Sequence, residues 1–296
     1  EKLRLQGLHI KKEAELATVV SKATTELDSF DGLDKEEEVE AVLRARHTLN
    51  ETGELSGKPR DVGGDLMLLR YARSVEQNEV STSSDHAIEV VSAVRKGFAE
   101  REKLGANQTR TRILKDDLAF HTVPDATKLQ KAWPHNMHLD RSLEGHIVQF
   151  EAWGSADVAA LSAHWGNGRF LTAMVFLHEL LNMMVVELSH RERRLLGVLT
   201  LVDAGGMTTY HAELLQFLAE AREMRRTIYP CMVAEVVVLN SSVSGATRRA
   251  LRALQLPGTA LQFDEDRRLI SAQRVGGSGG HNRHRVAPIL TPHDGV

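Results

Sequence analysis

The sequence is poor in cysteine and in net charge. Cys231 is its only cysteine, which excludes an internal disulfide framework and suits a reducing compartment. The formal net charge is −3 and the pI is near 6.6. The chain as a whole therefore has no electrostatic drive toward nucleic acid, and we predict no nucleic-acid partner. With 42% hydrophobic and 26% charged residues among 296, the composition is that of a globular protein with one large or two moderate domains.

Long apolar runs are also scarce. The longest, residues 170–188, is interrupted by polar side chains such as His178 and Glu179, so it predicts a buried helix rather than a membrane span. No signal peptide is visible. Because the chain starts at Glu1 rather than at Met, the earlier removal of a leader peptide is an open alternative. We expect a cytoplasmic protein.

The familiar catalytic motifs are missing. The sequence has no Gly-x-Ser-x-Gly nucleophile elbow and no phosphate-binding loop with a Lys-Ser/Thr end. Gly166-Asn167-Gly168 lacks the third glycine of a dinucleotide loop. Asp203 ends a predicted strand, where α/β proteins place functional residues, but an acid before Gly-Gly often caps the turn. Nothing in the sequence supplies a base for Cys231. We predict no catalytic residues. An enzyme with an unrecognised site ranks third, after the two non-enzymatic functions given at the end of this section.

Metal-binding patterns are incomplete. His178-Glu179-Leu-Leu-Asn182 approaches the helical zinc motif, but Asn182 stands where the second histidine is required. His135-Asn-Met-His138 and His281-Asn-Arg-His284 each lack a third ligand. We therefore predict neither a metal nor a cofactor.

The most informative stretch is residues 195–263, which reads as strand, helix, strand. Residues 197–203 and 234–240 are apolar and rich in β-branched side chains, and residues 210–227 carry a helical pattern between them. Such a unit has parallel strands and a right-handed crossover, and its apolar strands are buried on both faces. Further strands are predicted at 146–151 and 259–263. The fold class is therefore α/β with a mostly parallel sheet.

The chain before this unit is mainly helical. Helical patterns cover residues 10–27, 34–49, 66–73 and 87–104, and Gly and Pro gather in a linker at 51–64. Loops and a short helix are predicted after 118, then helices at 156–163 and 170–189. We divide the chain into an N-terminal helical extension (1–62), a small helical lobe (63–117), the α/β domain (118–275) and a flexible tail (276–296).

Several motifs resemble, in order, those of the CRAL-TRIO family, the lipid-binding fold of the fungal phosphatidylinositol transfer proteins. The matching segments are Leu68-Leu69-Arg70-Tyr71, Phe98 to Arg101, Asp140 to Glu151, Leu201 to Gly205, and Tyr229-Pro230 to Asn240. They span about two thirds of the chain. The resemblance implies a helical N-terminal lobe and a sheet that floors a hydrophobic pocket closed by a mobile gate helix.

The resemblance also implies where a ligand lies. The pocket residues would be Gln149, Phe170, Met174, Val198, Thr200, Val202 and Phe217. The gate would fall on residues 241–256, with Ser244 and Gly245 at its hinge and Arg248, Arg249 and Arg252 facing outward. Each arginine could gain about 1 kcal/mol near an anionic leaflet, and an ordinary solvated helix face is the alternative.

The headgroup positions depart from the family pattern. The glutamate after Tyr-Pro is Cys231, and the gate-helix lysine falls on Ala253, so phosphoinositide binding is not expected. The phosphatidylcholine-binding tyrosine matches Gln149, and of the two strand hydroxyl positions, Val198 and Thr200, only Thr200 keeps its hydroxyl. A sterol, an isoprenoid or another apolar ligand stays open.

We therefore expect a non-enzymatic lipid-transfer protein that holds one hydrophobic ligand and exchanges it during transient, peripheral contact with membranes. Its partner is the lipid itself, and any protein partner is left open. The alternative is a regulatory or scaffold protein that kept the fold but lost ligand exchange. A pocket filled by the protein's own side chains would distinguish that alternative.

Overall fold

The computed structural model describes residues 25–31, 33, 37–75, 83–122, 125–166, 168–208, 211–240, 252 and 260–263. Within them a single five-stranded sheet is ordered β1-β2-β3-β4-β5. The strands are His135–Arg141, Ile147–Ala152, Val198–Asp203, Val233–Leu239 and Ala260–Phe263. β1 runs antiparallel to β2, and the other neighbours are parallel. The predicted α/β class with a mostly parallel sheet is confirmed.

The first strand was not predicted. We expected loops and a short helix after residue 118, but β1 occupies His135–Arg141 as the edge strand. Its side chains are mostly exposed or half-buried, with Met137 the buried exception, so the apolar alternation that marks a strand is absent. Pairing with β2 determines the strand instead. The helices Ala106–Lys115 (α6) and Arg60–Gly63 (α3) were also not predicted.

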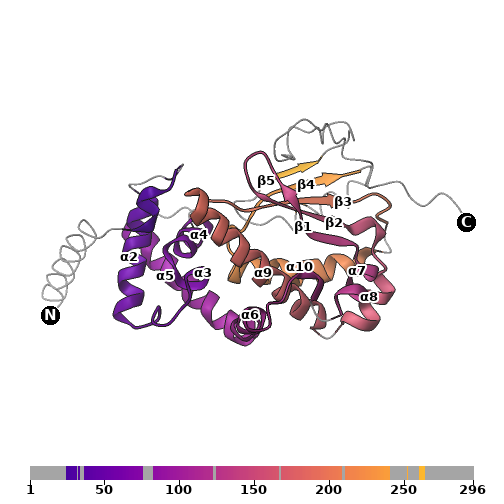
Figure 1. The fold of residues 1–296 in the computed structure, drawn as a ribbon, viewed down its shortest axis with the longest axis horizontal. Helices are drawn as coiled ribbons and strands as arrows, with labels where there is room; N and C mark the ends of the chain where they lie inside the picture. Colours follow the sequence, from indigo (N-terminus) through magenta and orange to yellow (C-terminus); the bar gives the residue numbers. More distant parts are fainter. Residues whose placement is uncertain are drawn as a thin grey trace, which may run out of the picture.

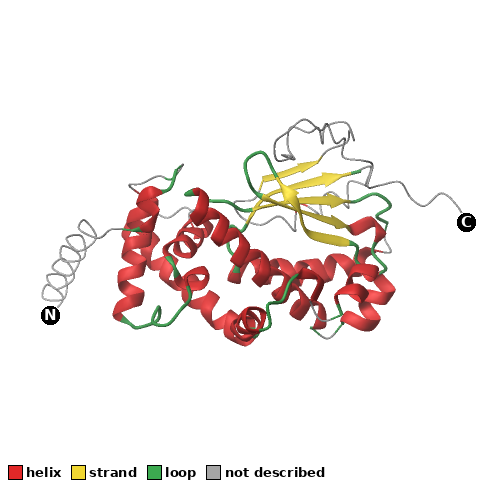
Figure 2. Cartoon of the chain, viewed as in Figure 1, coloured by secondary structure: helices red, strands yellow, loops and turns green. Residues whose placement is uncertain are grey.

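Two long helices cover one face of the sheet (Figures 1 and 2). They are α9, Arg169–Glu192, and α10, Ala212–Ile228, close to the predicted spans. Tyr229 ends α10 as its C-cap, because Pro230 disfavours helix in the residue before it. The helices α7, Ala126–Ala132, and α8, Val158–Trp165, lie at the end of the same layer. One core cluster joins all of these elements to the sheet.

Within the described residues, α9 alone is long and apolar enough to cross a bilayer. However, 67% of its most apolar window is buried inside the protein. That burial is what the core helix of a folded domain shows. The prediction of a buried helix at 170–188 therefore agrees with its place beneath the sheet.

A helical lobe precedes the sheet. It contains η1, Glu26–Ser29, α2, Glu37–Glu51, α4, Asp65–Val75, and α5, Ser83–Lys103. A second core cluster unites side chains of all four helices with Val186 of α9. The linker predicted at 51–64 forms turns and the short helix α3, and α2 on its far side packs on α4 and α5.

Arg70 of α4 connects this lobe to the sheet. Its side chain is fully buried, and its guanidinium donates to the carbonyls of Leu196 and Cys231, the latter at 2.6 Å. Those carbonyls precede β3 and β4. The helical lobe therefore holds the start of two central strands, in the part of the chain where the CRAL-TRIO resemblance places its Leu-Leu-Arg motif.

Candidate functional site

The predicted pocket residues of the sheet lie together. Gln149 on β2 is the register partner of Thr200 on β3, and Val198 and Val202 flank Thr200 on the same face by strand alternation. That face meets α9 and α10, because Val198 and Val202 belong to the core cluster of those helices. All four side chains are no more than 2% exposed. The opposite face carries a separate cluster that includes Leu199 and Leu201.

The predicted pocket residues of the helices lie over this face. Phe170 and Met174 of α9 are buried in the same core cluster, and Phe217 of α10 is half-buried against it. The ring centroids of Phe170 and Phe217 are 5.3 Å apart, and those of Phe170 and Trp133 are 5.6 Å apart. All seven predicted side chains thus belong to one interior between sheet and helices. In this structure they pack closely on one another.

A short chain of polar groups crosses this apolar interior. Gln149 Nε2 donates to Thr200 Oγ1 at 2.8 Å and to Glu151 Oε1 at 3.1 Å. Trp153 Nε1 donates to Glu151 Oε2 at 2.7 Å. Glu151 is buried, two residues from Gln149 and on the same face of β2. These side chains form a hydrogen-bonded polar chain in otherwise apolar surroundings.

The charges near this chain are few. Burial raises the pKa of Glu151, and the charge of Arg225 together with the hydrogen bond from Trp153 opposes that rise. Burial and the charge of Arg225 lower the pKa of His178 to about 3, so His178 is neutral at pH 7. Burial also lowers the pKa of Arg225. The groups that act on one another here are therefore the Glu151 carboxyl, the Arg225 guanidinium and the neutral His178 imidazole.

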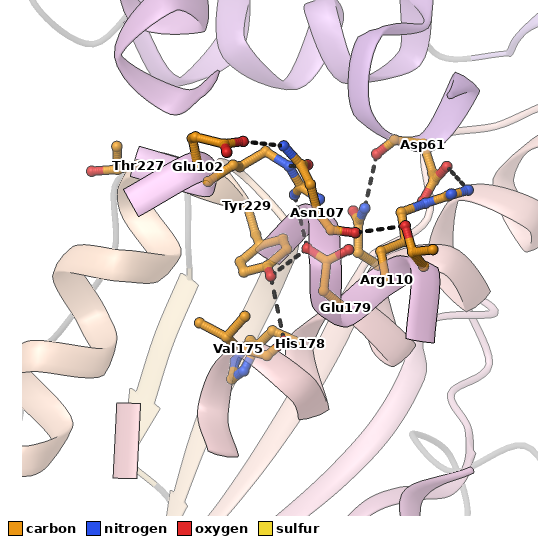
Figure 3. A network of polar contacts seen from close by, with 12 residues as sticks. Asp61, Glu102, Asn107, Arg110, Val175, His178, Glu179, Thr227 and Tyr229 are labelled. Atoms are coloured by element: carbon orange, nitrogen blue, oxygen red, sulfur yellow. Dashed lines mark hydrogen bonds and ion pairs between the residues drawn. The ribbon is translucent and has the colours of Figure 1, made fainter. Parts of the chain in front are cut away.

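A second polar network joins the helical lobe to α9 and α10 (Figure 3). The carboxylate of Glu179 contacts Arg101 Nη1 and accepts the hydroxyl of Tyr229 at 2.6 Å. Burial raises the pKa of Glu179, against the influence of Arg101. Beside it, Arg110 forms a bidentate pair with Asp61 at 2.7 and 2.6 Å. The network connects α5 of the helical lobe with α9 and the end of α10, although Arg101 Nη2 and Glu179 Oε2 are buried without a hydrogen-bond partner among the described residues.

The incomplete zinc motif has a structural role. His178 Nδ1 lies 2.7 Å from the carbonyl of Met174, and Asn182 Nδ2 donates to the carbonyl of Asp61 at 2.9 Å. Among the described residues, no group of three His, Cys, Asp or Glu side chains could hold a metal ion. His135 and His138 lie on β1, and His281 and His284 lie outside the described residues.

The two candidate reactive groups serve the backbone. Asp203 Oδ1 accepts from the amide of Gly205 at 2.9 Å and from Asn240 Nδ2 at 2.7 Å, so it caps the turn after β3. Cys231 is half-buried with a positive φ of 49°, and its carbonyl is held by Arg70. Asp203 therefore caps the turn, the alternative that the sequence analysis gave for it.

The predicted gate lies almost entirely outside the described residues. Ser244, Gly245, Arg248 and Arg249 belong to that part, and Arg252 is a described residue with an exposed side chain. The gate helix therefore stays a prediction.

Sequence reasoning missed four polar residues of the interior: Glu151, Trp153, Arg225 and His178. Glu151 had a usable signal, because it follows Gln149 by two positions on a predicted strand and so shares its face. Arg225 had none, because charged residues near the end of an amphipathic helix usually face water.

Comparisons with known proteins give the fold. No family model matches the chain. No curated protein matches it either. Among solved structures, it is similar to that of Sfh5, a Sec14-like CRAL-TRIO protein. The TM-score is 0.50 at 9% sequence identity, over 78% of this chain and 81% of that chain. The chain therefore has a Sec14-like fold.

Proposed function

We propose that this protein is a non-enzymatic lipid-binding protein that holds one hydrophobic ligand between the sheet and α9–α10 and exchanges it at membranes. The observation that supports the proposal is the interior itself. Apolar side chains of β3, α9 and α10 enclose a short polar chain, Thr200–Gln149–Glu151, on a Sec14-like fold. Apolar walls with a few placed polar groups are typical of lipid and cofactor sites.

Ligand entry requires the interior to open. The side chains of Gln149 and Thr200 are almost completely covered, so a ligand reaches them only if neighbouring groups move. Val236, the β4 neighbour of Thr200, is only half-buried, so the β4 side of the interior is less tightly covered than the Gln149–Thr200 pair. Residues 241–256, where the gate helix is predicted, follow β4 in the chain.

The exchange step would take place at a membrane surface. Arg252 is exposed, and Arg248 and Arg249 precede it in the predicted gate helix. Near an anionic leaflet each basic residue contributes about 1 kcal/mol, an attraction that salt screens. We therefore expect transient peripheral contact from the cytoplasmic side.

The test is native mass spectrometry, with lipid extraction, of protein purified from a lipid-rich host, followed by transfer between donor and acceptor vesicles. One stoichiometric lipid and measurable transfer are the expected results. Val236→Trp fills the β4 side and should reduce transfer, whereas Leu143→Trp at an exposed turn is the matched control and should not. An apo mass with no uptake from mixed vesicles would overturn the proposal.

Two observations favour a second candidate, a regulatory or scaffold protein on the same fold. Cys231 stands where the family's phosphoinositide-binding members have glutamate, and Arg70 holds its carbonyl in the structure. The pocket residues also pack closely on one another. An apo mass combined with specific retention of a protein partner would support this second function.

A further inference from the structure

We infer that the β1–β2 hairpin, residues 139–146, is a membrane-contact site whose leucine side chains enter a phospholipid surface. This inference rests on the proposed function, because it adds a contact, separate from the predicted gate, to the membrane step of lipid exchange. Four large apolar side chains are exposed in the described part of the chain, and two of them, Leu139 at 38% and Leu143 at 58%, belong to this hairpin. The loop that carries Leu143 projects beyond the sheet (Figure 1).

The turn that carries Leu143 is held in one conformation. The amide of Ser142 donates to the carbonyl of His146 at 2.9 Å, and the amide of His146 donates to the Ser142 hydroxyl at 3.1 Å. Gly145 has a positive φ of 83°, and a Cβ at this position would press on two arginine guanidiniums. Because the turn is already ordered, placing Leu143 in a membrane costs little further conformational freedom of the chain.

Arginine side chains surround the base of this turn. Arg141 Nη1 lies 2.5 Å from the carboxylate of Glu192 at the end of α9. Arg194 Nη2 lies 3.0 Å and Arg191 Nη2 3.9 Å from the same carboxylate. One carboxylate is thus shared by three guanidiniums, and Arg191 and Arg194 are 63% and 41% exposed. Guanidiniums with donors to spare are well suited to the phosphate groups of phospholipids.

The charges in and beside the hairpin balance among the described residues. Four arginines stand against four acids: Arg141, Arg191, Arg193 and Arg194, and Asp31, Asp140, Glu144 and Glu192. Attraction to an anionic surface therefore does not drive this contact. A zwitterionic phospholipid matches it better, because its phosphate suits the arginines and its ammonium group suits Glu144. The leucines supply the driving force, and salt does not screen the burial of apolar surface.

The size of the apolar tip favours a membrane over a protein partner. A protein–protein interface of standard size buries about 1,600 Å², of which two leucines on one turn supply only a small part. The acyl chains of a fluid bilayer close around a projecting side chain without a matching pocket. Leu114 of α6 is 57% exposed but lacks this setting, because Arg112 beside it lies 3.8 Å from its own acid, Asp116.

The experiment measures co-sedimentation of the full chain with phosphatidylcholine vesicles at low and high salt. Leu143→Ser should lower the partition onto vesicles about tenfold, the loss of roughly one leucine's burial. Leu114→Ser removes an equally exposed leucine from α6 and should leave the partition unchanged. Wild-type binding should change little with salt. Phosphatidylserine should add a salt-sensitive part that comes from the gate arginines and is the same in Leu143→Ser.

A second measurement locates the inserted residue. Leu143→Trp keeps an apolar side chain at the tip, and its fluorescence should be quenched by vesicles of brominated phosphatidylcholine. Leu114→Trp is the matched control and should be quenched no more than the wild-type protein, whose own tryptophans are buried.

Three results would overturn the inference alone while wild-type protein still takes up lipid in native mass spectrometry. They are equal partition of Leu143→Ser and wild type, an equal loss in Leu114→Ser, and no extra quenching of Leu143→Trp. A protein partner retained through Leu143 without vesicle binding would also overturn it. Wild-type protein that neither binds vesicles nor takes up lipid would overturn the proposed function and this inference with it.

Discussion

Arg101 Nη1 lies 2.8 Å from Glu179 Oε1, and the two side chains are 2% and 0% exposed. Arg101 comes from α5 of the helical lobe and Glu179 from α9 beneath the sheet. Tyr229, at the end of α10, donates to the same carboxylate and has the Arg101 guanidinium 5.9 Å from its ring centroid. One buried ion pair therefore connects the two lobes and the crossover helix that leads into β4.

Removing one member of this pair should be costly. Glu179→Leu or Arg101→Met leaves a buried charge without its partner, which destabilises proteins by about 3–5 kcal/mol. The double variant Arg101→Met/Glu179→Leu leaves no buried charge and should cost much less than either single change. Urea denaturation followed by circular dichroism gives the free energies of unfolding.

Lys103→Met provides the control for that comparison, because it breaks the exposed pair with Glu100 and should change stability by no more than about 1 kcal/mol. Single variants as stable as the control would show that the pair does not hold the lobes together.

Gly97 of α5 lies close against α4 and α10. A Cβ at this position would lie 1.9 Å from the hydroxyl of Tyr71 on α4 and 3.0 Å from the carbonyl of Thr227 on α10. Gly97→Ala should therefore destabilise the protein, although alanine favours an isolated helix by about 1 kcal/mol. Thermal melts should show the loss.

Tyr71→Phe in the Gly97→Ala background removes the hydroxyl that clashes, so it should recover part of that stability. The same Tyr71→Phe change in wild-type protein should cost stability, because it removes the hydrogen bond to Thr227. If the changes in stability from the two substitutions were purely additive, the methyl group added at position 97 would not contact the Tyr71 hydroxyl.

The sequence predicted those elements whose side chains carry their own periodic signal. The strand predicted at 197–203 is found at Val198–Asp203, because an apolar run rich in β-branched residues between two helices is typical of a buried parallel strand. The strand β1 carries no such signal. It is a mostly exposed edge strand, and its existence depends on β2 as a partner some ten residues later in the chain.

The same distinction applies to the interior site. The face shared by Val198, Thr200 and Val202 follows from strand alternation, so it could be predicted without a structure, whereas Gln149 reaches that face through the register of β2 with β3. The positions of Arg225 and His178 could not, because they depend on how α9 and α10 lie across the sheet. Helix periodicity gives the apolar face of each helix and leaves the partner of a buried charge undetermined.

Arg70 should be among the most sensitive positions in the helical lobe. Its guanidinium satisfies the carbonyls of Leu196 and Cys231 at once, and burial lowers its pKa to about 10, so it stays charged at pH 7. Arg70→Met would leave both carbonyls without that donor, at about 1–3 kcal/mol for each buried group that stays unsatisfied. Arg70→Lys should recover only part of the stability that Arg70→Met loses, because a single ammonium group replaces a guanidinium that donates to two carbonyls.

Amide hydrogen exchange reports the consequence directly, since the residues around Leu196 and Cys231 at the start of β3 and β4 should lose protection in Arg70→Met. Arg226→Met, which breaks a half-exposed pair with Glu223, is the control and should leave that protection intact. Unchanged exchange at both strand starts would mean that Arg70 does not position the sheet.

His178 should make the stability of the protein depend on pH. Its folded-state pKa is lowered to about 3 by burial and by Arg225, whereas an unfolded histidine titrates near 6.5. Between these values the unfolded chain binds a proton that the folded protein does not, so stability falls as pH falls. The contribution of His178 is complete above about pH 6.5. Between pH 6.5 and pH 3 the free energy of unfolding should decrease by up to about 1.4 kcal/mol for each pH unit that the pH is lowered.

Urea titrations from pH 7 to pH 4 measure that slope, and His178→Leu, which cannot titrate, should reduce it. The substitution of an exposed histidine, His164→Leu, is the control and should leave it unchanged. If His178→Leu and wild-type protein lose stability in parallel, the acid sensitivity comes from other groups, and His178 does not remain neutral in the folded protein.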